Sequence, residues 1–410
     1  MTNTDQPAPN NSNTSTWLTP GVAGIGMASL LADVGHEIPT ALLPSLLVST
    51  LGAPASALGA IEGVSDALAG LAKLGGGALA DDPDRRRSVA VGGYAATAVL
   101  SAGIGAATAT WHVALLRAGA WTARGLRGPA RNALRADAVP AEAYGRAYGF
   151  ERAMDNLGAI AGPLAAIALV ATVGTRWAIG VSVVPGLLAA VAVVYAIRHT
   201  TTTASTERPR APLRIRVRPV LTGPLRTPFA GIGAFELGNC AATLLILRAT
   251  ELLKPGRGTD SATTIALGLY VAYNATATLT SLGAGRRTDR VGATRVMALG
   301  VAAFAVAYLG FTRDTGAWAA LLPWFVLAGI GIGCVETAEH AAVATHAPLE
   351  LRGSAFGLLA GVQSLGNLAA SGIAGILWTV LSPSWAFAYL AAWMVIALLA
   401  LVVTTRPTRS

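Results

Sequence analysis

Long apolar runs alternate with short polar breaks along the chain from Trp17 onward. A helix needs about 20 mainly apolar residues to cross the hydrocarbon core of a bilayer. Applied to the apolar runs, this length predicts transmembrane helices over residues 19–50, 56–80, 88–110, 112–136, 144–172, 176–198, 227–253, 261–284, 293–313, 317–345, 352–381 and 384–404. We therefore expect an all-α polytopic membrane protein with twelve transmembrane helices.

The composition narrows the class further. Hydrophobic residues make up 53% of the 410 residues and charged residues only 12%, whereas a soluble domain carries roughly 25% charged residues. This shortage of charge excludes a soluble enzyme, a disordered protein and a nucleic-acid-binding protein. Cys240 and Cys334 lie in separate apolar runs without a CxxC motif. The sequence therefore predicts neither a disulfide framework nor a zinc site.

The basic residues are distributed asymmetrically between the predicted connections. The connections on one side hold Arg85, Arg86, Arg87, Arg146, Arg152, Arg286, Arg287, Arg290, Arg295, Arg352 and the arginines of 199–226. The connections on the opposite side hold only Arg176, Lys254, Arg257 and Arg313. Cytoplasmic loops are enriched in Lys and Arg. We therefore expect a multi-pass protein of the cell membrane with both termini in the cytoplasm. The net charge of +9 then needs no nucleic-acid partner.

The chain repeats itself at one offset. Asp81 in GALADDPDRRR matches Asp289 in GRRTDRVGATR, 208 positions later, and at the same offset Gly145, Gly149 and Gly158 match Gly353, Gly357 and Gly366. We predict two homologous six-helix bundles, at 19–198 and 227–404, joined by a cytoplasmic linker, 199–226. A disordered tail, 1–18, and a short tail, 405–410, flank them. Repeats of parallel topology around a midplane site are a transporter architecture.

The segment after the second predicted helix resembles the loop signature G-x-L-A-D-R-x-G-R-R of the major facilitator superfamily, and the resemblance covers nearly the whole chain. Asp82 and Asp84 stand where that family has Arg and Gly. The resemblance implies the superfamily's fold and a loop that latches the outward-open state, with Asp81 and Asp289 in that role. The matching residues are Gly77, Leu79, Ala80, Asp81, Arg85 and Arg86, and in the second half Gly285, Asp289, Arg290 and Gly292.

The fifth predicted helix resembles the signature G-x-x-x-G-P-x-x-G of proton-coupled efflux members of that family. Gly158, Gly162 and Pro163 match, and Ala166 takes the last position. Small residues allow close helix packing and Pro allows a local bend. The resemblance implies antiport and hence export, although an ordinary small-residue interface has the same pattern.

Ionisable side chains at membrane depth are costly and usually face a cavity or one another. Asp33 and Glu37 lie mid-helix, where a poor dielectric and a neighbouring carboxylate favour proton binding. We expect them to include the proton-coupling acid, with Glu236 or Glu336 as alternates; the structural alternative is that they only pair with arginines such as Arg124. Candidates for the proton-coupling and substrate cavity are Asp33, His36, Glu37, Glu62, Asp66, Arg124, Glu236, Asn239, Glu336, Glu339 and His340.

Two substrate alternatives stay open. His36 and Glu37, together with Glu336 and His340, form a divalent-metal pattern if the two helix faces meet. The arginines of the fourth predicted helix favour an anionic metabolite. Of these, Arg124 is expected in the cavity, whereas Arg127 and Arg131 are expected to pair with Glu142, Glu151 or Asp155.

These patterns favour a transporter over an enzyme. We predict a secondary active transporter that couples protons to the export of a small molecule or ion by alternating access, as a monomer in the lipid bilayer and without a cofactor. An intramembrane enzyme or a lipid flippase is the alternative from another class. For an enzyme, Asp33 and His36 are the only pair of residues in the sequence that we can nominate as catalytic.

Overall fold

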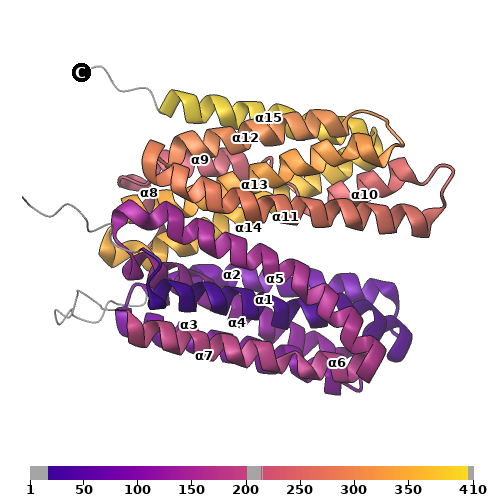
Figure 1. The fold of residues 1–410 in the computed structure, drawn as a ribbon, viewed down its shortest axis with the longest axis horizontal. Coiled ribbons are helices and arrows are strands. Elements are labelled where there is room, and N and C mark those ends of the chain that lie inside the picture. Colours follow the sequence, from indigo (N-terminus) through magenta and orange to yellow (C-terminus); the bar gives the residue numbers. More distant parts are fainter. Residues whose placement is uncertain (1–16, 201–213, 215, 405–410) are drawn as a thin grey trace, which may run out of the picture.

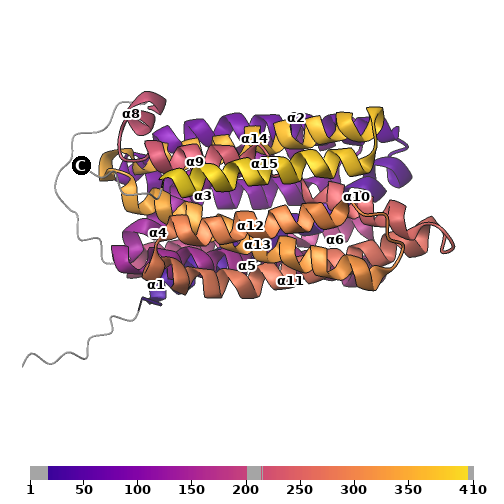
Figure 2. The ribbon, with the colours of Figure 1, turned by 90° about the horizontal axis from the view of Figure 1, so that it is seen from above.

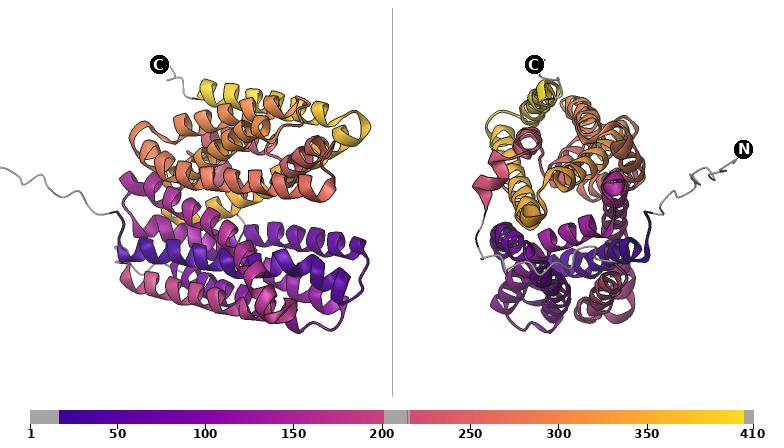
Figure 3. Two further views of the ribbon diagram at one scale, coloured as in Figure 1. Left: turned by 45° about the vertical axis from the view of Figure 1, so that its right-hand side comes forward. Right: turned by 90° about the vertical axis from the view of Figure 1, so that its left-hand side faces the viewer.

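The computed structural model describes residues 17–200, 214 and 216–404, and in these residues all regular structure is helical. Most of the predicted linker, most of the N-terminal tail and the whole C-terminal tail lie outside the described residues. The long helices run along a common axis and form two groups, one from each half of the chain (Figure 1). Viewed along the helices, the two groups are separate bundles (Figure 3).

Each bundle contains six membrane-spanning segments, as predicted. The N-terminal bundle comprises α1 (Pro20–Pro44) with the π-helix η1 (Ser45–Thr50), α2 (Ala55–Ala80), α3 (Pro83–Gly103), α4 (Thr110–Ala138), α5 (Tyr144–Val173), and α6 (Thr175–Val181) followed by α7 (Val183–His199). The C-terminal bundle comprises α9 (Arg226–Glu236) followed by α10 (Ala242–Leu253), α11 (Thr259–Val291), α12 (Ala293–Phe311), α13 (Trp318–His346), α14 (Arg352–Val380) and α15 (Pro383–Thr404).

Three features depart from the predicted pattern. The seventh predicted helix is interrupted between Glu236 and Ala242, and the sixth is interrupted at Ser182. In the described part of the linker, a short helix, α8 (Val217–Thr222), precedes the second bundle. In addition, Arg146 and Arg152, which the charge pattern assigned to a connection, lie inside α5, as the predicted helix over 144–172 implied. Long apolar runs do not reveal such breaks, because both helical pieces have the same composition.

Eight of the helices in the described residues are long and apolar enough to cross a membrane by themselves. The other four spans are α1 with η1, α2, α4, and the broken pair α9 and α10. Those four hold most of the polar residues that the sequence placed at membrane depth. The helices that are poorest as isolated spans are therefore the ones whose polar groups need partners inside the protein.

The helix ends follow local chemistry. Thr19 caps α1 by accepting a hydrogen bond from the Val22 N–H at 3.3 Å. Asp82, which stands where the loop signature has Arg, caps α3 by accepting from the N–H of Asp84 and Arg85, with Pro83 in the first helical position. Gly292 ends α11 with φ +89°, a backbone conformation that glycine adopts without strain.

The helix pairing repeats between the halves. α1 packs on α5 and α7 as α9 packs on α14 and α15, and α2 and α3 pack on α4 as α11 and α12 pack on α13. The bundles meet through two equivalent pairs, α5 with α11 and α2 with α14. Figure 2 shows the C-terminal bundle in front with α2 lying alongside α14. This pairing supports the internal repeat inferred from the sequence.

The closest contacts between the bundles lie at one end of the molecule, which we call the basic end. It is the end where α2 passes into α3, α5 and α14 begin, and α11 passes into α12 (Figure 1). There, backbone meets backbone: Gly145 and Gly149 of α5 lie against α11, and Gly353 and Gly357 of α14 lie against Gly77 of α2. The apolar core of the C-terminal bundle continues across this end to the buried Tyr144 and Tyr148.

Candidate transport site and gate

On α1, Asp33, His36 and Glu37 form one cluster, as the i, i+3, i+4 spacing predicted. His36 Nδ1 lies 2.9 Å from the carbonyl oxygen of Ala32 and 3.3 Å from Asp33 Oδ1, and its Nε2 lies 3.3 Å from Glu37 Oε1. Arg124 of α4 reaches within 3.8 Å of Asp33 Oδ1. The cluster thus combines two carboxylates with one imidazole and one guanidinium.

A second cluster joins α2 to α4. Arg117 Nη2 lies 2.9 Å from the Glu62 carboxylate, and its Nη1 donates to Thr40 at 3.0 Å. The Arg117 guanidinium also lies over the Trp121 ring, 3.3 Å from its centroid, and Trp121 Nε1 donates to Asp66 at 2.8 Å. Trp121 therefore connects Arg117 and Asp66.

In the C-terminal bundle two carboxyl groups are buried and, among the described residues, have no Lys or Arg partner. Glu236 is 2% exposed, and its Oε2 accepts a hydrogen bond from Asn239 Nδ2 at 3.1 Å. Glu339 is 0% exposed, and its Oε1 accepts from Gln363 Nε2. Among the described residues, no Lys or Arg nitrogen lies within 4.0 Å of either carboxylate. His340 Nδ1 is 3.7 Å from Glu339 Oε1, but it also lies 2.7 Å from the carbonyl oxygen of Glu336.

Four charged side chains at mid-helix depth retain access to solvent. Glu37, Glu62, Glu336 and Arg124 are 29%, 32%, 30% and 40% exposed. The two halves also interact electrostatically here, through Glu37 with Tyr270 and through Lys73 with Glu236. Lys73 Nζ donates to Ser364 Oγ of α14 at 2.6 Å. Side chains of the two bundles therefore meet at this depth through Lys73 and Ser364.

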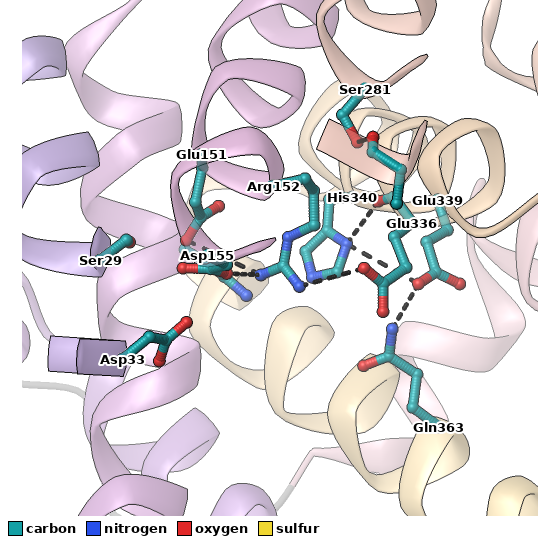
Figure 4. A network of polar contacts seen from close by, with 12 residues as sticks. Ser29, Asp33, Glu151, Arg152, Asp155, Ser281, Glu336, Glu339, His340 and Gln363 are labelled. Carbon is teal, nitrogen blue, oxygen red and sulfur yellow. Dashed lines mark hydrogen bonds and ion pairs between the residues drawn. The ribbon is translucent and has the colours of Figure 1, made fainter. Parts of the chain in front are cut away.

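Towards the basic end, a buried ionic network connects the bundles (Figure 4). Arg131 Nε lies 2.9 Å from Glu151 and its Nη1 lies 3.4 Å from Asp155, which confirms the pairing expected for Arg131. Arg135 pairs with the same Glu151. Arg152 bridges the halves, because it reaches Asp155 at 2.8 Å and Glu336 of α13 at 3.4 Å.

The two loop-signature aspartates cap helices of the opposite bundle. Asp289 Oδ1 accepts from the Gly145 N–H at 2.6 Å, and its Oδ2 accepts from Arg146 Nε at 2.7 Å. Asp81 Oδ1 accepts from the Ser354 N–H at 2.8 Å, and the Ser354 hydroxyl donates to Oδ2. Burial raises the pKa of Asp81, while the hydrogen bonds from Ser354 oppose that rise. The carboxylates thus satisfy free N–H groups at the starts of α5 and α14.

The remaining loop-signature residues have less uniform positions. Arg86 folds back to donate to the carbonyl oxygen of Ala80 at 2.7 Å and pairs with Asp137, to which Arg352 of α14 also donates at 2.8 Å. Arg85 lies 3.6 Å from Asp82. Gly285 packs on Gly145. Arg290 is exposed.

The glycines of the fifth span pack directly on the acids of α1. A methyl group built on Gly158 would overlap Cβ of Asp33, and one on Gly162 would overlap Cβ of Glu37. In the second half, Gly366 of α14 lies against Glu236 of α9 in the same way. Pro163 lies inside α5, next to Gly162. In each bundle a glycine therefore lets one helix lie against the acid-bearing face of its neighbour.

The divalent-metal alternative required two helix faces to meet, and they do not. His36 and Glu37 do not come together with Glu336 and His340, since the described residues contain no group of three or more His, Cys, Asp or Glu side chains that could hold a metal ion. The His340 ring lies instead near those of Tyr148 and Phe356, at centroid distances of 5.7 and 6.2 Å.

Arg127, in turn, pairs with none of Glu142, Glu151 and Asp155. Its guanidinium lies over the Tyr94 ring, 4.0 Å from the centroid. That part of the expectation is wrong, because the position of Arg127 on α4 turns its side chain into the N-terminal bundle and away from α5.

Sequence reasoning missed two important partners. Gln363 lies among apolar residues of α14 and gave no charge signal, although it provides the hydrogen bond to Glu339. Arg152 was taken as a topology signal, although its i, i+3 spacing from Asp155 placed both on one helix face.

Two six-helix bundles, with eight helices in the described residues long and apolar enough to cross a membrane, indicate a polytopic membrane protein. The chain belongs to the major facilitator superfamily, since the sequence model of that family, Major Facilitator Superfamily, matches residues 25–253 and 253–410. As a member, it moves a small solute across a membrane.

Similar proteins agree with this assignment. An uncharacterized protein of Mycobacterium tuberculosis strain H37Rv is 30% identical over 367 residues, which is 87% of this chain and 86% of that protein. An uncharacterized MFS-type transporter of Methanocaldococcus jannaschii is 24% identical over 381 residues, 92% and 93% of the two chains. Among solved structures, a bacterial homologue of the iron transporter ferroportin in its outward-facing state has the same fold, with a TM-score of 0.76 at 14% identity over 94% of this chain and 99% of that one.

Proposed function

We propose that this protein is a proton-coupled antiporter that exports a small molecule by alternating access. Because cytoplasmic loops are enriched in Lys and Arg, we assign the basic end to the cytoplasm, with both termini on that side. The contact of the bundles at the basic end supports a carrier that is closed towards the cytoplasm in this state. The opening of that end would require the ionic network and the two aspartate caps to separate.

The observation that carries the proposal is the environment of Glu339. This carboxyl is fully buried, hydrogen-bonded to Gln363 and without a Lys or Arg nitrogen within 4.0 Å. An isolated buried carboxylate is very costly, so the group is expected to hold a proton while it is closed off. It can release that proton once the cytoplasmic side opens to water. Glu236 has a similar environment and is the second candidate.

The surrounding charges suggest how proton and cargo exclude each other. Glu236 interacts electrostatically with Glu336 and Lys73, and Glu339 interacts with Glu236 and Glu336. Three carboxyl groups thus share Lys73 and Arg152 as their nearby bases. Protons or a positively charged cargo can neutralise the negative charge that Lys73 and Arg152 do not balance. Competition between the two for the same carboxyl groups gives antiport, and it favours a cationic cargo.

The α1 cluster, with Asp33, His36 and Glu37, then has a supporting role in our proposal. Its carboxylates lie beside His36 and Arg124, which can balance their charge. The packing of Gly158 and Gly162 on these acids connects α5, and through it Arg152, to the position of α1. We infer that this contact transmits a shift of α1 to the gate, which agrees with the efflux-type signature of the fifth span.

One observation favours the anionic-metabolite alternative. Arg124 is 40% exposed, and its one carboxylate contact among the described residues is Asp33 at 3.8 Å. A guanidinium with free donors suits a carboxylate or phosphate. An anionic cargo would place its negative group at Arg124 and would be symported or exchanged without competing for Glu339.

The test uses purified protein in proteoliposomes with an imposed pH gradient. A thermal-shift panel of organic cations, organic anions and divalent ions first selects a compound that stabilises the protein. Pyranine trapped inside then reports proton movement when that compound is added. Proton movement opposite to the compound supports antiport. Proton movement in the same direction, compound flux without protons, or product formation without flux would reject it.

A further inference from the structure

A short helix, α8, lies at the basic end and leads into α9. It packs on α9 and on α14, and Figure 2 shows it at the edge of the molecule, next to the start of α14. Val220 of α8 and the following Leu225 are buried and belong to the apolar core of the C-terminal bundle. One side of α8 is therefore anchored to this bundle, whereas its other side chains face outwards.

Three arginines around α8 are exposed. Arg214 precedes α8, Arg218 lies within it, and Arg226 is the first residue of α9. Among the described residues, no carboxylate oxygen lies within 4.0 Å of their side-chain nitrogens. Arg216 differs from them, because it is partly buried and interacts electrostatically with Asp81. The three exposed arginines thus carry a positive charge that the described part of the chain does not balance.

Two exposed aliphatic side chains accompany this charge. Val217 is 37% exposed and Leu221 is 38% exposed. Together with Arg218 they lie within about 100° of one another around the helix axis. A helix face that combines arginine with exposed aliphatic side chains is typical of helices that lie in the interface of a membrane. We call Arg214, Val217, Arg218, Leu221 and Arg226 the α8 surface.

The packing of α9 on α15 places this surface at the level of the lipid headgroups. The apolar span of α15 ends at Val402, and Gly231 of α9 lies directly against Leu401. Arg226 comes five residues before Gly231, which puts it about 7–8 Å further towards the basic end at 1.5 Å per residue. The headgroup layer extends about 5–8 Å beyond the hydrocarbon core. Arg226, and α8 before it, therefore lie where headgroup phosphates are found.

We propose that the α8 surface binds the headgroups of anionic phospholipids, with phosphatidylglycerol as the representative lipid. The three guanidinium groups would donate hydrogen bonds to the phosphate oxygens. Val217 and Leu221 would contact the upper part of the acyl chains. A soluble anion could balance the arginines but would leave the aliphatic side chains in water, which is why the chemistry favours a lipid.

The positive charge is particular to the segment before the second bundle. At the offset of 208 residues that relates the two halves, Arg214, Arg218 and Arg226 correspond to Gln6, Asn10 and Leu18. Residues 1–18, which precede the first bundle, contain no Lys or Arg. The inference does not depend on proton coupling or on the direction of transport, because the α8 surface lies outside the candidate transport site.

The test measures how brominated lipids quench a bimane label on Thr222→Cys, in the full chain without Cys240 and Cys334, reconstituted in phosphatidylcholine vesicles. Thr222 is exposed on α8. Brominated phosphatidylglycerol should quench the label at a mole fraction about fivefold or more below that of brominated phosphatidylcholine. This preference should weaken as the salt concentration rises, because salt screens the attraction. The comparison needs no change in the arginines.

Two matched variants then locate the preference. Replacing Arg214, Arg218 and Arg226 with Gln should abolish it. The control replaces three other exposed arginines of the basic end with Gln and should keep it: Arg286, Arg287 and Arg295.

Three outcomes would overturn the inference. Equal quenching by the two lipids would show that α8 does not select an anionic headgroup. An equal loss of the preference in both arginine variants would show that the net charge of the basic end attracts the lipid without a site. Removal of the preference by inorganic phosphate at matched ionic strength would assign the surface to a soluble anion.

Discussion

Asp289 of the C-terminal bundle caps Gly145 of the N-terminal bundle, with Oδ1 2.6 Å from the backbone nitrogen. The equivalent pair runs the other way, since Asp81 of the N-terminal bundle caps Ser354 of the C-terminal bundle at 2.8 Å. Asp81 and Asp289 differ by 208 positions, as do Arg146 and Ser354. Each half therefore stabilises the start of a helix in the other half, and the repeat in the sequence becomes a reciprocal contact in space.

Removing either cap should open the basic end. Hydrogen bonds to a charged group contribute about 1.5–3 kcal/mol, so Asp289→Ala or Asp81→Ala should raise the open population about tenfold or more. Spin labels at the exposed positions Glu142→Cys and Arg290→Cys, in a chain without Cys240 and Cys334, would report longer distances. Asp84→Ala is the control, since this acid is exposed and forms no ion pair within 4.0 Å with the other bundle among the described residues. Unchanged distances in both cap variants would contradict the role of the caps.

Loss of the ion pair between Arg152 and Glu336 should have a similar effect deeper in the protein. Arg152→Gln removes the one side chain of the network that reaches across to α13 at 3.4 Å. We expect Ser281→Cys, fully buried between the halves, to react several-fold faster with a membrane-impermeant maleimide in this background. The exposed Arg287→Gln should leave the rate unchanged. Equal labelling in the Arg152 and Arg287 variants would show that the network does not hold the gate.

The glycines beside the α1 acids should not tolerate a methyl group. Gly162→Ala places Cβ onto Cβ of Glu37, and overpacking of this kind costs about 1–3 kcal/mol. Its Tm in detergent should fall by several degrees. Gly92→Ala is the matched control, since no atom lies within 4 Å of its added methyl group. It should be neutral or slightly stabilising because Ala is the better helix former. A Gly162 variant as stable as the Gly92 variant would exclude the tight contact.

Much of the architecture could be predicted because the physics is local. A bilayer demands about 20 apolar residues per helix, and the polar breaks between such runs are visible in the sequence. The repeat of Asp81 at Asp289, 208 positions later, predicts the two homologous bundles without any knowledge of contacts. The break at residues 237–241 could not be predicted, because its reason is tertiary: the Ala241 N–H is satisfied by Ser371 of α14 at 2.8 Å.

The candidate residues could be named from the sequence, and so could the pairing of Arg131 with Glu151 and Asp155, but the other pairings could not. The i, i+3, i+4 spacing placed Asp33, His36 and Glu37 together because one helix carries all three. Whether an acidic side chain pairs with a basic one depends on contacts between different helices, which the sequence does not show. Arg131 finds Glu151, whereas Glu339 finds only the neutral Gln363. The emphasis on Asp33 and Glu37 followed from their depth and their clustering. Our proposal moves it to Glu339, because this carboxyl has no Lys or Arg partner among the described residues.

The central claim is that Glu339 carries the coupling proton. The most direct measurement compares two transport modes of Glu339→Gln in proteoliposomes, with a compound selected by the thermal-shift panel. Glutamine keeps the shape and the hydrogen bond to Gln363 but cannot exchange a proton. We predict that exchange of compound across the bilayer at equal pH persists, while accumulation driven by a pH gradient is lost. Accumulation at the wild-type level in the Gln variant would contradict the account.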